Sequence, residues 1–146
     1  MRQRYPIQIQ VVEKDGGNIV FKASLPVESI FNSSSKFDEL LAYVERKYTQ
    51  TIRECKELLK RSTFQKRANS KVYWIIGDSI LKFMRSLEDT PFYLRNQCAF
   101  FARDLGLSQT SIWKIIRFRK KFPKKDLIDP TIPWSLYREG RVELSR

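Results

Sequence analysis

Nine basic residues and a single acid, Asp104, lie in one stretch of the sequence, residues 91–125. The nine are Arg95, Arg103, Lys114, Arg117, Arg119, Lys120, Lys121, Lys124 and Lys125. This stretch therefore carries +8 of the +12 net charge of the 146-residue chain. A solvated helix face usually mixes charges of both signs, so this concentration of one sign favours contact with phosphate groups.

The same stretch contains a spacing that resembles the helix-turn-helix of DNA-binding regulators. Ala102 is followed by Gly106, and then by Ile112 and Ile115. A small residue lets two helices cross closely, a glycine turns the chain, and the isoleucines seat the second helix on the core. Ser108 stands where that second helix needs an N-terminal cap. The alternative is a plain helical hairpin within the core.

Four side chains of the expected second helix are predicted to point away from its isoleucine face and to read bases. They are Gln109, Thr110, Lys114 and Arg117. Glutamine, lysine and arginine hydrogen-bond to adenine and guanine edges in the major groove of DNA. The predicted phosphate contacts are Arg95, Arg103, Ser108, Arg119, Lys120, Lys121, Lys124 and Lys125. Trp113 is expected to pack on the core, with stacking on a sugar as the alternative.

The residue types present offer little for catalysis. The chain has no histidine, which excludes Ser-His and Cys-His nucleophile pairs and the commonest zinc ligand. The Glu-x-Lys triplets at residues 45–47 and 54–56 match a fragment of nuclease sites, but both fall in a helical pattern. Cys55 and Cys98 are expected to be small apolar residues of a reducing compartment. We predict that the protein is not an enzyme and needs no metal or cofactor.

The hydrophobic pattern indicates an α+β protein that is mostly helical. Apolar residues alternate on either side of Gly16 and Gly17 between residues 6 and 25, which predicts a β-hairpin. A lone hairpin is marginally stable, so this one must pack on the helices or on a second copy. From Lys36 to about residue 62 the apolar period is that of one long helix.

The remainder of the chain is expected to be helical. The pattern predicts a helix through residues 72–87, short helices at about 94–105 and 109–121, a loop over 122–133, and a last short helix that ends at Gly140. We divide the chain into a hairpin with linker at 1–35, a long helix at 36–67 as a candidate dimerisation element, and a DNA-binding domain at 68–146.

Residues 68–141 also resemble one protein family. The most specific matches are Tyr73-Trp74-x-x-Gly77 and Trp134-Ser135-x-Tyr137-Arg138. The family is the N-terminal helix-turn-helix region of bacterial proteins that usually continue into a restriction-type nuclease domain. This resemblance implies a DNA-binding module from mobile-element or defence biology. No catalytic residue of the nuclease domain can be carried over to this chain.

These observations predict a protein that binds double-stranded DNA with sequence preference, of the regulator, partition or replication-site type. It would read the major groove with helix 109–121 as a homodimer, for example in transcription regulation. We expect a cytoplasmic protein with no membrane contact, because no apolar run exceeds five residues and the first residues lack the apolar core of a signal peptide. The alternative is an accessory subunit of a nuclease or recombinase that acts mainly through contacts with a protein partner.

Overall fold

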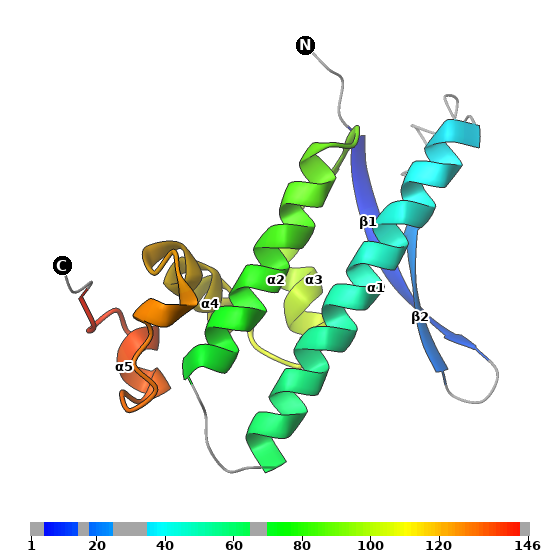
Figure 1. Cartoon of the computed structure of the whole chain (residues 1–146). Coiled ribbons are helices and arrows are strands. Elements are labelled where there is room, and N and C mark those ends of the chain that lie inside the picture. Colours follow the sequence, from blue (N-terminus) through cyan, green and yellow to red (C-terminus); the bar gives the residue numbers. More distant parts are fainter. Residues whose placement is uncertain (1–4, 15–17, 25–34, 65–69, 144–146) are drawn as a thin grey trace.

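The computed structural model describes residues 5–14, 18–24, 35–64 and 70–143 (Figure 1). The strands are β1 (Tyr5–Lys14), β2 (Asn18–Ser24) and β3 (Phe92–Leu94). The helices are α1 (Ser35–Phe64), α2 (Ser70–Glu88), α3 (Gln97–Leu105), α4 (Gln109–Lys121) and α5 (Trp134–Arg138), with a short 3-10 helix, η2 (Lys125–Leu127), between α4 and α5. The predicted class, α+β and mostly helical, is confirmed.

Strands β1 and β2 form the predicted antiparallel hairpin, in which Ile9 lies opposite Ala23. The predicted turn glycines, Gly16 and Gly17, lie outside the described residues. The hairpin packs on α1, whose Glu45 carboxylate accepts a hydrogen bond from the Ala23 amide at 2.8 Å. Ile9 and Phe21 of the hairpin are buried within the same chain, whereas Val11 is exposed.

The local sequence pattern does not predict β3, which pairs in parallel with the first residues of β1. The helix expected from about residue 94 begins at Gln97 instead, after Asn96 adopts a left-handed conformation with φ of 53°. Three residues are too few to show an alternating pattern. They become a strand because the free edge of β1, about 85 residues earlier in the sequence, lies beside them.

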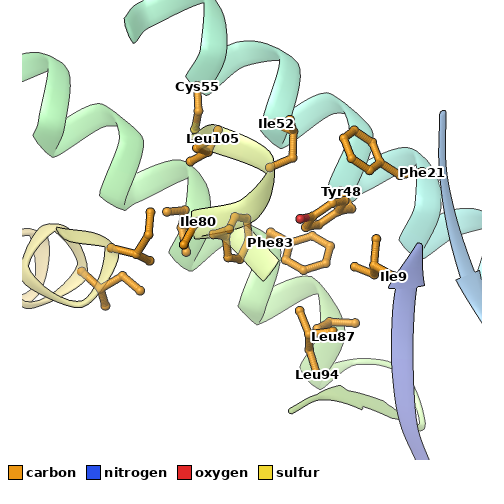
Figure 2. Close-up of a cluster of buried hydrophobic side chains, with 14 of the residues drawn as sticks. Ile9, Phe21, Tyr48, Ile52, Cys55, Ile80, Phe83, Leu87, Leu94 and Leu105 are labelled. Atoms are coloured by element: carbon orange, nitrogen blue, oxygen red, sulfur yellow. The ribbon is translucent and has the colours of Figure 1, made fainter. Parts of the chain in front are cut away.

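One hydrophobic core joins the hairpin to the helices (Figure 2). The buried side chains labelled there come from the hairpin (Ile9, Phe21), α1 (Tyr48, Ile52, Cys55), α2 (Ile80, Phe83, Leu87), β3 (Leu94) and α3 (Leu105). Most apolar side chains of α1 are thus buried or partly buried within this chain. All three predicted segments, 1–35, 36–67 and 68–146, contribute side chains to this one core.

Tyr48 connects the long helix α1 to α3 by hydrogen bonds within the core. Its hydroxyl donates to the carboxylate of Asp104, and the carbonyl oxygen of Phe100 accepts from the same hydroxyl at 3.2 Å. Asp104 also accepts two hydrogen bonds from the Arg103 guanidinium, at 2.8 and 2.9 Å. Burial and the neighbouring Asp104 carboxylate raise the pKa of Tyr48 well above its usual value. The single acid of the basic stretch is therefore a buried structural group.

Figure 1 shows how the helices and the hairpin are arranged in space. Helices α1 and α2 lie side by side, with the hairpin against α1, while α4 and α5 lie beyond α2. Both free cysteines belong to this body: Cys55 is buried and Cys98 is half-buried. None of the described helices is both long enough and apolar enough to cross a membrane.

Candidate nucleic-acid interface

A tight turn joins α3 to α4 at the position that the sequence predicts. Gly106 has a φ of +71°, and the Leu107 amide donates to the Ala102 carbonyl oxygen at 3.0 Å. A residue with a side chain is strained in this left-handed conformation, so glycine suits the end of α3. The predicted order of helix, turn and helix is confirmed as local structure.

Ser108 caps the N-terminus of α4, as the sequence predicts. Its hydroxyl oxygen accepts a hydrogen bond from the Ser111 amide at 3.0 Å and lies 2.8 Å from the Ser111 hydroxyl. The cap satisfies one of the amides that the first turn of a helix leaves unpaired. The Ser108 side chain, predicted to contact phosphate, is thus occupied by the helix itself.

The inner face of α4 is fixed by a close approach to α2. Ile112 and Ile115 are fully buried, as their spacing predicts. On α2, a Cβ atom at Gly77 would lie 2.8 Å from the Cβ of Arg119 and 3.0 Å from the carbonyl oxygen of Ile115. The two helices can approach this closely only because residue 77 has no side chain. Gly77 belongs to the Tyr73-Trp74-x-x-Gly77 motif, so this close packing explains why the motif ends in a glycine.

The outer face of α4 carries exposed side chains of several chemical types. Gln109, Thr110, Arg117 and Lys120 are exposed, and so is Trp113, with 53% of its surface accessible. The expectation that Trp113 packs on the core is therefore wrong, because residue 113 lies on the side of the helix away from the buried isoleucines. The guanidinium carbon of Arg117 lies 4.8 Å from the centre of the Trp113 ring.

Two of the predicted base-reading residues contact α5. The Lys114 ammonium forms an ion pair with Glu139 at 3.1 Å, and an Arg117 nitrogen donates to the carbonyl oxygen of Arg138 at 2.7 Å. The hydrogen bond and positive charge of Lys114 lower the pKa of Glu139 below its usual value. Gln109 and Thr110 are thus exposed, whereas contacts with Arg138 and Glu139 hold Arg117 and Lys114 against the C-terminal segment.

Two of the predicted phosphate contacts are paired with acids of the same chain. Arg103 binds the buried Asp104, and Arg119 binds Asp78 of α2 at 3.0 Å. Burial raises the pKa of Asp78, but hydrogen bonds from Arg119 and Lys82 outweigh it and hold the pKa below its usual value. Only 13% of the Arg119 side chain is exposed, and its guanidinium lies 4.7 Å from the centre of the Trp74 ring. Arg119 therefore helps to fix α4 on α2.

Four of the other predicted phosphate contacts are exposed, and Lys121 is half-buried. Arg95, Lys120, Lys124 and Lys125 are exposed, and Lys121 lies 3.8 Å from Glu143 in a long ion pair. Arg95 stays near the Tyr93 hydroxyl, 3.2 Å away. Arg95 lies before α3, whereas Lys120, Lys121, Lys124 and Lys125 lie at the C-terminal end of α4 and just beyond it, so positive charge gathers at that end of α4.

No known protein family, curated protein or solved structure matches this chain. The resemblance over residues 68–141 thus stays a prediction.

Both Glu-x-Lys triplets lie in the helix α1, whereas in nuclease sites this fragment lies on a strand. Glu45 accepts the hydrogen bond from β2, and Glu54 accepts one from Gln50 on its own helix at 3.1 Å. Within the described ranges, no three His, Cys, Asp or Glu side chains gather in a way that could hold a metal ion. The surface of α4 and its surroundings is thus the best-supported candidate site.

Proposed function

We propose that this protein binds double-stranded DNA with sequence preference, by placing α4 in the major groove. The observation that carries the proposal is the two-sided character of α4. One side is fixed by fully buried isoleucines, and the other presents amide, hydroxyl, indole and guanidinium groups to solvent. A rigid helix with hydrogen-bonding groups on its outer face suits base recognition in a groove about 12 Å wide.

The N-terminal end of α4 is the part proposed to reach furthest into the groove. Gln109 and Thr110 are exposed there, directly after the Ser108 cap. Recognition helices usually contact base edges with their first residues. Gln109 suits adenine, because its amide oxygen can accept a hydrogen bond from the N6 amino group while its amide nitrogen donates one to N7. Arg117 and Lys114 lie further along the helix and would contact guanine after release from α5.

The flanking cations are proposed to hold the DNA backbone. Arg95, Lys120, Lys124 and Lys125 are exposed, and none of them forms an ion pair with another described residue. Such contacts fix the position of a protein on the duplex without reading its sequence. The pairs Arg103–Asp104 and Arg119–Asp78 leave those two arginines with a mainly structural role.

One α4 helix of 13 residues, about 20 Å long, spans only a few base pairs. We therefore propose that the protein acts as a homodimer, which reads two half-sites about 34 Å apart. We further propose a cytoplasmic protein with a regulator, partition or replication-site role, which fits binding without catalysis.

Fluorescence anisotropy with labelled duplex DNA at several salt concentrations tests this function. Each phosphate neutralised by the protein contributes about −0.9 to the slope of log affinity against log salt concentration, so a total slope of about −4 to −8 is expected. Absence of duplex binding at about 50 mM salt, or a slope near zero, would rule the proposal out.

A further inference from the structure

A groove of about 490 Å³ lies between α2, the start of α3 and the C-terminal half of α4. Leu81 and Met84 of α2 and Ile116 of α4 supply its apolar part. Its polar side chains are Arg85, Glu88, Gln97, Arg119 and Lys120. The groove thus brings together basic residues from two helices that are far apart in sequence.

Helical spacing explains why both helices present a cation here. Arg85 follows Leu81 by four residues on α2, and Lys120 follows Ile116 by four on α4, so each cation stands on the same face as an apolar residue of the groove. Both helices turn these faces toward one another, because α2 and α4 pack together at Gly77.

The three basic side chains of the groove differ in whether they have an acidic partner among the described residues. Arg119 is neutralised by Asp78, to which it is bound at 3.0 Å. Arg85 and Lys120 are exposed, and neither side chain forms an ion pair or hydrogen bond with the residues that the structure describes. Two cations on separate helices therefore line one groove, with Glu88 as the acid beside them.

We propose that this groove binds one phosphodiester group of the DNA backbone, held by Arg85 and Lys120. The inference rests on the proposed function, because Lys120 also borders the exposed face of α4. A guanidinium presents parallel N–H groups that match two phosphate oxygens, and the Gln97 amide offers a further donor. Arg85 lies outside the basic stretch at residues 91–125, so charge density along the sequence does not single it out.

Arg85→Ala tests the groove, and Arg46→Ala is its matched control. Arg46 is an exposed arginine of α1 with no ion pair to another described residue, so both variants remove the same charge from a helix surface. At about 0.1 M salt, Arg85→Ala is expected to weaken duplex binding about eightfold and to reduce the salt slope by about 0.9. Arg46→Ala is expected to change the affinity less than about twofold.

A second arm identifies the phosphate itself. Uncharged methylphosphonate groups are placed one at a time along a bound duplex, and wild-type protein is expected to lose about eightfold at each backbone position that it contacts, including the one held in the groove. Arg85→Ala should show a smaller loss than wild type at that position, because only Lys120 then holds that phosphate, whereas an equal loss would contradict the assignment. Glu88→Gln should strengthen binding of the unmodified duplex, because it removes the acid that faces the phosphate.

The outcomes separate the groove from the function. If wild-type protein binds duplex DNA but Arg85→Ala equals Arg46→Ala, the groove does not hold the backbone and α4 alone remains as the interface. A groove that serves free phosphate would show the same equality, together with Arg85-dependent binding of inorganic phosphate. If wild-type protein does not bind duplex DNA at all, both the function and the groove assignment are wrong.

Discussion

Lys114 of α4 and Glu139, just beyond α5, form an ion pair at 3.1 Å across the edge of the proposed reading face. The pair holds a predicted base-reading lysine against the C-terminal segment. It also places a carboxylate next to the helix that is proposed to approach DNA. The negative charge of Glu139 is thus expected to weaken the DNA binding that the neighbouring cations are proposed to favour. Replacement of Glu139 measures this effect.

Glu139→Gln is expected to strengthen duplex binding. The change frees Lys114 and removes a negative charge near the DNA, and the worth of an exposed ion pair corresponds to a gain of about two- to fivefold. Anisotropy titration measures the gain, with Glu57→Gln on α1 as the control that removes the same charge from another exposed pair. Equal effects of the two variants would show that net charge alone acts.

The same pair gives a dependence on pH. Lys114 lowers the pKa of Glu139, so the carboxylate is charged and the pair is present at neutral pH, and it is lost as the pH falls through that lowered pKa. NMR titration of the Glu139 carboxyl in the free protein should therefore show a pKa below that of an ordinary glutamate, and Lys114→Ala should return it toward that value. A wild-type Glu139 that titrates like an ordinary glutamate would contradict the pairing.

Gly77→Ala is expected to destabilise the protein. The added Cβ would lie 2.8 Å from the Arg119 Cβ and 3.0 Å from a backbone oxygen of α4, so the two helices must separate. Overpacking of this kind costs about 1–3 kcal/mol in the free energy of unfolding, which chemical denaturation measures. Ser86→Ala, on the same helix, should change it by less than about 0.5 kcal/mol. A neutral Gly77→Ala variant would show that α4 is not seated closely on α2.

Tyr48→Phe is expected to weaken the connection between α1 and α3. The change removes the hydroxyl that donates to the buried Asp104 carboxylate, and loss of a buried partner costs about 1–3 kcal/mol at neutral pH. Because the pKa of Tyr48 is raised in the folded state, the stability linked to it is present below about pH 10 and falls as the pH rises further. Denaturation from pH 7 to 11 should show this fall in the wild type and a smaller one in Tyr48→Phe. Identical profiles would contradict the assignment.

Trp113→Ala is expected to leave stability nearly unchanged and to weaken DNA binding. More than half of the Trp113 surface is exposed, and its ring supports the Arg117 guanidinium at 4.8 Å. The ring orients the Arg117 guanidinium on the face proposed to meet DNA, so its removal is expected to lower the duplex affinity by roughly two- to fivefold. Thermal unfolding and anisotropy measure the two effects separately. A large drop in melting temperature would mean that the ring packs on the core after all.

The local part of the fold could be predicted from sequence, because its determinants lie close together along the chain. The spacing from Ala102 through Gly106 to Ile115 predicts the turn and both helices, and Ser108 marks the start of α4. The strand β3 could not be predicted, since its partner β1 is far away in the sequence.

The side-chain contacts of the candidate site could not be predicted from local sequence patterns either, because the paired residues lie far apart in the sequence. Lys114 and Glu139 are 25 residues apart, and Arg119 and Asp78 are 41 apart. Charge counting treats all nine basic residues of the stretch alike. The packing of α4 against α2 and α5 distinguishes Arg117 and Arg119, which contact residues of the same chain, from the exposed lysines proposed to contact DNA.

The most direct test of the central claim is selection of bound duplexes from a random pool. Wild-type protein should enrich a recurrent sequence. The variant Gln109→Ala/Arg117→Ala should still bind duplexes but lose the preference at particular positions, whereas Lys124→Ala/Lys125→Ala should keep the preference and bind all duplexes more weakly. If no sequence is enriched, or if both variants enrich the wild-type sequence equally, α4 does not read bases.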